Sequence, residues 1–238
     1  AFFLSSCGYA WLKPNFRGST GFGYHYMQSS NNDFGKGRVL EDILDAIDWV
    51  KKNGLGVNAP TAIVGESFGG FSAIAAATFD SRFAVAIAAM PALDIGQVRK
   101  SLIDRQVRTN DAQRLAFLWG DLNDVGLLSK LHEQSPSNHA DLLNTPLYLW
   151  AGARDPIVPV SHIKSYALKQ LENGKSISLM IDKQAQHGPV TQQSMLAYMA
   201  MMEHVLSRYL NGSAQPVTDT KLKHSLIKMQ TLDSTAWL

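Results

Sequence analysis

One short run of the sequence combines a serine with flanking glycines: Gly65-Glu66-Ser67-Phe68-Gly69-Gly70. An apolar stretch, 61–64, precedes it, and an Ala-rich helical pattern from Phe68 to Thr78 follows. This strand–turn–helix context is typical of a nucleophile elbow, whose tight turn lifts the hydroxyl above a sheet. The N–H of the residue after the serine then faces a developing oxyanion at the helix N-terminus. We predict that Ser67 is a nucleophile and that Phe68 supplies an oxyanion-binding N–H; the alternative is a Gly-Ser turn without chemistry.

A serine hydroxyl is a weak nucleophile until a base takes its proton, so a histidine and an acid must accompany Ser67. Asp155 directly follows the apolar run 146–151, and His187 comes shortly after the apolar run 177–181. The order Ser, Asp, His, with each residue after a strand, is that of enzymes with the α/β-hydrolase fold. We therefore predict that His187 is the general base and that Asp155 orients its imidazole.

Other acids and histidines fit these roles less well. Asp94 also follows a strand-like run, but the first one after the serine, which is too early for the acid. Asp182 ends a strand and is more simply a turn residue. A histidine in a helix or an inserted segment is more often solvated or packed than catalytic; this applies to His132, His139, His162 and His204. No sequence pattern indicates a metal or a dinucleotide, so no cofactor is predicted.

The elements that must position these residues follow a regular alternation. Strand-like runs occur at 10–12, 61–64, 83–89, 146–151 and 177–181, and helical patterns at 39–52, 68–78, 161–172 and 190–210. Such alternation predicts an α/β protein with a mostly parallel sheet and helices on both faces. We expect one domain over 1–210, with a mostly helical insertion at 95–139. The tail 211–238 is either an ordered strap or a disordered end.

Composition limits the possible partners and compartments. Hydrophobic residues make up 45% and charged residues 18%, which is typical of a globular protein. The net charge of +2 and the lack of a Lys/Arg stripe argue against nucleic acid. Cys7 is the only cysteine, which excludes an intramolecular disulfide and favours a reducing compartment such as the cytoplasm. No apolar stretch is long enough to span a bilayer, so no membrane partner is expected.

Several segments, taken in chain order, resemble motifs of the prolyl oligopeptidase family of serine peptidases. The loop Asn15-Phe16-Arg17-Gly18-Ser19 is similar to the family's asparagine-x-arginine-glycine-serine loop, and the elbow itself is similar to the family's elbow. Segments 135–147 resemble the lead-in to the acid strand, and segments 152–159 and 186–188 resemble the acid and histidine loops. The resemblance extends from about Phe3 to Leu210 and is strongest to the acylaminoacyl-peptidase and dipeptidyl-peptidase branch.

The resemblance implies a triad of Ser67, Asp155 and His187, and gives Arg17 a structural role near the floor of the active site. It also implies an N-terminal β-propeller in the parent protein, which restricts access to peptides of modest length. The family's first strands, and a loop with a second oxyanion donor, would precede Phe2. We therefore expect an α/β-hydrolase domain that lacks these strands, and loss of that donor would lower the rate by about 10²–10³.

Three functions are consistent with the sequence. The first is a serine peptidase that hydrolyses short peptides through an acyl-enzyme. The second is a carboxylesterase with the same triad, and the third is a catalytically silent hydrolase fold that serves as an interaction module. Glu66 either influences substrate choice or faces solvent. The substrate pocket is expected to include part of the insertion, where Phe117, Leu118 and Trp119 are candidates or else core residues; the oligomeric state is left open.

Overall fold

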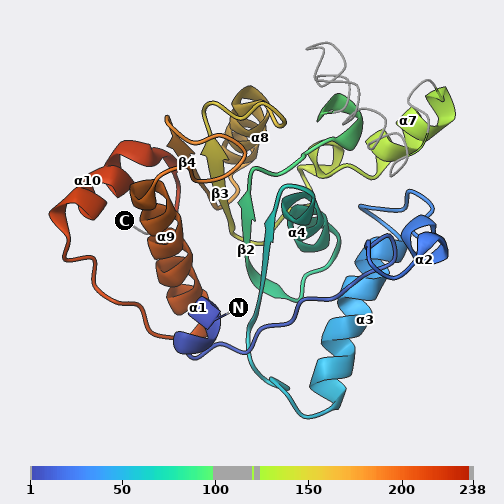
Figure 1. Ribbon diagram of the computed structural model, residues 1–238, viewed down its shortest axis with the longest axis horizontal. Coiled ribbons are helices and arrows are strands. Elements are labelled where there is room, and N and C mark those ends of the chain that lie inside the picture. Colours follow the sequence, from blue (N-terminus) through green and yellow to red (C-terminus); the bar gives the residue numbers. More distant parts are fainter. Residues whose placement is uncertain (1, 99–119, 121–123, 236–238) are drawn as a thin grey trace.

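The computed structural model describes residues 2–98, 120 and 124–235. Its centre is a five-stranded sheet in the order β1-β2-β3-β4-β5 (Figure 1). The strands are β1 (Thr61–Glu66), β2 (Phe83–Ala89), β3 (Leu147–Gly152), β4 (Ile177–Asp182) and β5 (Gln230–Asp233). The first four run parallel to one another, and β5 is antiparallel to β4. The predicted mostly parallel sheet is confirmed.

Helices cover both faces of this sheet, as the alternation predicts. Among the described residues they are α1 (Phe2–Ser6), α2 (Tyr24–Gln28), α3 (Arg38–Lys52), α4 (Phe68–Phe79), α7 (Val125–Glu133), α8 (Val160–Glu172), α9 (Gln192–Leu210) and α10 (Thr220–Met229), with a 3-10 turn η1 (Pro136–His139). In Figure 1, α9 and α10 lie on one side of the sheet and α3 and α4 on the other. None of the helices in the described ranges is long and apolar enough to cross a lipid bilayer.

Strand β3 shows how the two layers are built. Successive side chains of a strand point to opposite faces. Leu147 and Leu149 are completely buried in the cluster formed with α3, α4 and α8. Tyr148 and Trp150 are completely buried in the other cluster, formed mainly with α9 and α10. A strand that is buried on both faces reads as a continuous apolar run, which is why 146–151 was recognisable from sequence.

The structure corrects one expected strand and settles the tail. The apolar run Ala10-Trp11-Leu12 forms no strand, because nothing in the described part of the chain pairs with it, and Trp11 and Leu12 are each 46% exposed. The tail is an ordered strap as far as Thr235: α10 packs on α9 and leads into β5. The insertion is helical at 95–98, in α7 and in η1. Phe117, Leu118 and Trp119 lie outside the described residues.

Candidate active site

The turn between β1 and α4 holds Ser67 in an unusual backbone conformation. Ser67 has φ 54° and ψ −117°, and its N–H donates to the carbonyl of Ala89 at the end of β2 (2.8 Å). A non-glycine residue in such a region costs on the order of 1–3 kcal/mol and persists only where its surroundings hold it. Here the neighbouring strand holds it, and the first residue of α4, Phe68, follows directly. The elbow geometry predicted from the glycine pattern is present.

The glycines around Ser67 do not contribute equally. A Cβ at Gly65 would lie 2.0 Å from the carbonyl oxygen of Gly69, a collision that no backbone tolerates. A Cβ at Gly70 would lie 3.1 Å from the carbonyl oxygen of Ala89 and from Pro91. At Gly69 nothing outside its own helix lies within 4 Å. The close approach of strand and helix therefore requires Gly65 and restricts residue 70, while Gly69 is not required by space.

Three side chains predicted from sequence meet at the ends of β1, β3 and β4. His187 Nε2 lies 2.8 Å from Ser67 Oγ, and His187 Nδ1 lies 2.7 Å from Asp155 Oδ2. A carboxylate only accepts hydrogen bonds, so Nδ1 carries a proton and donates it to Asp155. Nε2 is then free to accept the hydrogen bond from the Ser67 hydroxyl. The hydroxyl, imidazole and carboxylate thus form a continuous relay.

Burial and hydrogen bonds hold the acid of the relay in place. The side chain of Asp155 is 1% exposed, whereas that of His187 is 20% exposed. The second oxygen, Oδ1, accepts from the N–H groups of Ile157 (2.7 Å) and Val158 (2.9 Å). An ionised carboxylate at this depth needs such donors to offset the loss of water. Asp155 is therefore fixed as an oriented acceptor for the histidine.

The loop that carries the acid packs directly against the loop that carries the histidine. The N–H of Arg154 donates to the carbonyl of Ala185 (3.0 Å). A Cβ at Gly152 would lie 2.0 Å from the carbonyl oxygen of Gln186 and 2.7 Å from that of Ala185. Only a glycine allows the two loops to approach this closely. Gly152 and the N–H of Arg154 thus hold the loop of Asp155 against the loop of His187.

The rival acids and histidines lie elsewhere. The Asp94 carboxylate, 3% exposed, contacts His132 Nδ1 at 2.8 Å in a separate pair. Asp182, expected to be a turn residue, is instead the last residue of β4, and its side chain accepts from the N–H of Gln184 just after the strand (2.9 Å). His139 and His204 each contact a backbone carbonyl close by in the chain. None of these groups joins the relay.

Two of the residues singled out from sequence have partners that the sequence did not reveal. Arg17 binds the carboxylate of Asp42 through its backbone N–H (2.6 Å), Nε and Nη2, which gives it the structural role expected. Glu66 is exposed, and its carboxylate also faces the hydroxyl of Tyr198. Burial, with the Glu66 charge as a smaller cause, raises the pKa of Tyr198 above its ordinary value.

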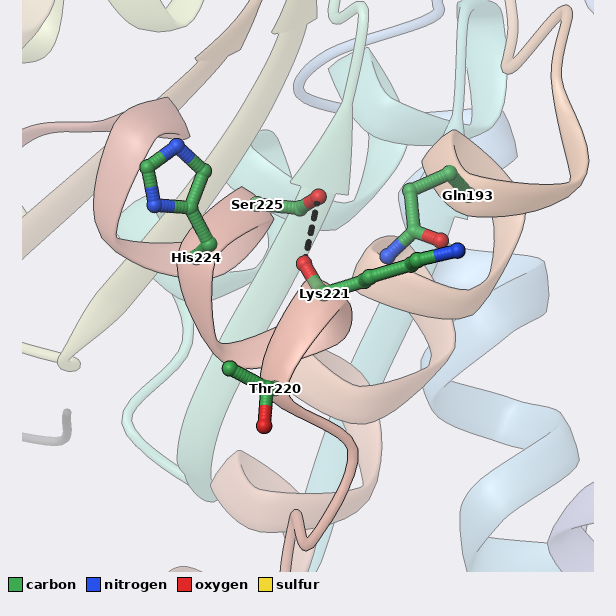
Figure 2. Close-up of a pocket in the computed structure, with 5 residues that line it drawn as sticks. All are labelled: Gln193, Thr220, Lys221, His224 and Ser225. Carbon is green, nitrogen blue, oxygen red and sulfur yellow. Dashed lines mark hydrogen bonds between the residues drawn. The ribbon is translucent and has the colours of Figure 1, made fainter.

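One cavity of the molecule lies away from the relay. It measures about 380 Å³ and is lined by residues of α9 and α10: Gln193, Thr220, Lys221, His224 and Ser225 (Figure 2). A second cavity, of about 300 Å³, includes Asp94 and His162. Neither contains Ser67, Asp155 or His187. Within the described ranges no group of three or more His, Cys, Asp or Glu residues is arranged to hold a metal ion.

Comparison with known proteins shows the family to which a chain with this geometry belongs. Residues 1–213 match the prolyl oligopeptidase family. Dipeptidyl aminopeptidase BIII of Pseudoxanthomonas mexicana is 27% identical over 215 residues, which are 90% of this chain and 31% of the relative. Acylamino-acid-releasing enzyme 1 of Oryza sativa subsp. japonica is 30% identical over 197 residues, 78% of this chain and 24% of the relative. This chain thus spans about a third or less of the curated relatives that it matches.

Solved structures show the same fold. A puromycin-hydrolysing peptidase of Mycobacterium tuberculosis superposes with a TM-score of 0.75 at 24% identity, over 85% of this chain and 30% of that one. An acylaminoacyl peptidase of Pyrococcus horikoshii superposes with a TM-score of 0.71 at 18% identity, over 89% and 33%. The fold is that of the α/β-hydrolases, with a serine at the sharp strand–helix turn. The chain belongs to the prolyl oligopeptidase family.

Proposed function

We propose that this chain carries the active site of a serine peptidase that hydrolyses peptide bonds of short peptides through an acyl-enzyme. The observation that supports this most directly is the relay, with 2.8 Å between Ser67 and His187 and 2.7 Å between His187 and Asp155. The family membership and the relatives named as peptidases support the choice of peptide as substrate.

In the proposed mechanism, His187 Nε2 takes the Ser67 proton as Oγ attacks the peptide carbonyl carbon. Asp155 holds Nδ1–H, which fixes the tautomer and stabilises the imidazolium that forms. The Phe68 N–H, at the N-terminus of α4, stabilises the oxyanion. The imidazolium then gives its proton to the leaving amine, and the C–N bond breaks. Water, deprotonated by His187, attacks the ester, and Ser67 regains its proton as the acid product leaves.

The rest of the protein is part of the same proposal. Because the chain spans about a third of its relatives, we place it within a longer polypeptide that carries an N-terminal β-propeller and limits access to short peptides. The single cysteine, Cys7, supports a cytoplasmic location. Determining the complete reading frame, and the intact mass of the protein in its native cells, tests both the propeller and the length.

The experiment uses the protein expressed from its complete reading frame. We expect a fluorophosphonate to label it once, on the peptide that contains Ser67, and we expect Ser67→Ala to remove labelling while the melting temperature stays unchanged. Labelling that persists in this variant would show that the nucleophile is another residue. A peptide anilide and a p-nitrophenyl ester are then compared: a carboxylesterase cleaves only the ester, and an interaction module reacts with neither substrate nor probe.

A further inference from the structure

The side chain next to the nucleophile lies at the centre of an aromatic cluster drawn from three parts of the chain. The ring of Phe68 lies 6.0 Å from that of Phe16, 5.3 Å from that of Phe34 and 5.7 Å from that of Phe71, measured between centroids. Phe71 belongs to the same helix, but Phe16 and Phe34 come from loops before α3. We call Phe16 and Phe34 the outer rings.

Each outer ring is held by a polar contact that fixes its loop. Next to Phe16, Arg17 binds the Asp42 carboxylate of α3 through its backbone N–H, Nε and Nη2, at 2.6 to 3.0 Å. The N–H groups of Phe34 and Gly35 both donate to Gln134 Oε1, at 2.6 and 2.8 Å. Neither loop is therefore free to carry its ring away from Phe68.

The strain at Ser67 explains why such support matters. Ser67 has φ 54°, and a residue in this region stays there only when its surroundings over-determine it. The Ser67 N–H is fixed on β2, but the peptide on its other side leads to Phe68, whose N–H is the proposed oxyanion donor. The orientation of a donor toward the oxygen sets its value in the transition state. Holding the Phe68 ring restrains the direction of this N–H.

From these contacts we infer that Phe16 and Phe34 are positioning residues: they fix the Phe68 ring, and through it the oxyanion-binding N–H, while the Arg17–Asp42 pair holds Phe16. This inference rests on the proposed function. It assigns to the asparagine-x-arginine-glycine-serine loop a role in the chemical step. Substrate affinity in the ground state is not part of that role, because the N–H acts mainly on the charge that develops during attack.

The first test replaces Phe16 in the full-length protein with Ala and with Leu. Losing one oxyanion donor entirely costs about 10²–10³ in rate, so a misdirected donor should cost about tenfold in kcat, with KM unchanged. Affinity for an aryl boronic acid, whose tetrahedral adduct places an oxygen at the same N–H, should fall in parallel. Phe16→Leu should restore most of kcat, because leucine keeps an apolar contact with Phe68.

Phe22→Ala is the matched control, since Phe22 follows on the same loop but is 56% exposed and pairs with Tyr26. It should leave kcat and boronate affinity unchanged. An unchanged kcat in Phe16→Ala, a loss confined to KM, or an equal loss in the control would overturn the inference. Labelling of the wild-type protein at Ser67 separates these outcomes from failure of the proposed function, because that labelling does not depend on Phe16.

A second pair of variants tests the support of Phe16. Asp42→Asn and Glu41→Gln remove the same charge from adjacent positions of α3. Asp42 binds Arg17 at three nitrogens, whereas Glu41, 62% exposed, reaches only Nη2 at 3.3 Å. Asp42→Asn should lower kcat by less than Phe16→Ala does, and Glu41→Gln should not lower it. Equal effects of the two variants, or none from Asp42→Asn, would contradict the role of the pair.

Discussion

The nucleophile turn, residues 65–70, follows β1 at one edge of the sheet, and the C-terminal strap forms the opposite edge. The two regions are built in different ways. At the turn, Ser67 has a positive φ and Gly65 has no room for a Cβ. The strap, α10 and β5, uses ordinary means: Asp219 caps α10 by accepting from the N–H of Leu222, and β5 pairs with β4. The turn lies inside the family match, 1–213, and the strap lies outside it. Chemistry demands an uncommon backbone, whereas closing a sheet edge demands only pairing and burial.

If the turn serves chemistry, its largest effect is on rate. We expect Ser67→Ala to lower kcat by about 10⁶-fold, since removing such a nucleophile from a triad leaves only the contribution of binding and the oxyanion donors. Because the hydroxyl contributes little to packing, the melting temperature should stay within error of wild type. Steady-state kinetics and thermal unfolding of the same preparations measure both quantities. A large loss of stability together with the loss of rate would show that Ser67 also supports the fold, which contradicts the expected difference between the turn and the strap.

Replacing the acid of the relay, Asp155, should give the second-largest loss of rate. We expect Asp155→Asn to lower kcat by about 10⁴-fold, because an amide presents the wrong group to His187 and favours the wrong tautomer. The matched control is Asp94→Asn, which alters the separate pair with His132 and should leave kcat nearly unchanged. Kinetics with one peptide anilide compare the two. Equal losses would show that the Asp94–His132 pair belongs to the catalytic machinery.

Substitution of Gly65 tests whether the close approach of β1 and α4 requires a glycine. In Gly65→Ala the added Cβ would meet the Gly69 carbonyl oxygen, and overpacking of this kind costs about 1–3 kcal/mol of stability. Gly69→Ala, where nothing outside the helix lies within 4 Å, should leave the free energy of unfolding unchanged or raise it slightly. Denaturant unfolding measures both variants. A Gly65→Ala variant as stable as wild type would show that strand and helix can separate without cost.

The strap should affect stability alone. Leu226 is 3% exposed and lies between α10 and α9. Replacing it with Ala should lower the free energy of unfolding by about 2–5 kcal/mol, because a cavity remains. Ile227→Ala on the exposed side of α10, where the residue is 66% exposed, should change stability by at most about 0.5 kcal/mol. Below the unfolding transition, kcat should be unchanged in both. A fall in kcat for the folded Leu226→Ala variant would mean that the strap reaches the active site.

The sequence predicted those parts of the molecule that strict local rules determine. The turn glycines, the strand before Ser67 and the helix after it are local in the chain, and their pattern predicts the position of the proposed nucleophile. Asp155 and His187 are predictable because each follows a strand that is buried on both faces, and such a strand appears in the sequence as a continuous apolar run. Their distance from Ser67 comes from the parallel sheet, whose strand ends meet at one edge.

The parts that the sequence did not reveal depend on contacts between distant residues. The run 10–12 is apolar enough for a strand, but a strand needs a hydrogen-bonded neighbour, and composition says nothing about that. The sequence of the tail does not distinguish an ordered strap from a disordered end, because α10 has a single well-buried residue, Leu226, and its pattern is weak. The pairing of Arg17 with Asp42, and of Phe34 with Gln134, joins residues 25 and 100 positions apart, and neither pair has a sequence signature.

The hydrogen bond between Ser67 and His187 spans 120 residues of chain. Ribosomes add about 5–20 residues per second, so the serine is incorporated roughly 6–24 s before its partner histidine. Throughout that interval the hydroxyl has no base to take its proton. A nascent chain of this kind therefore cannot carry out the proposed attack until nearly the whole domain has been synthesised.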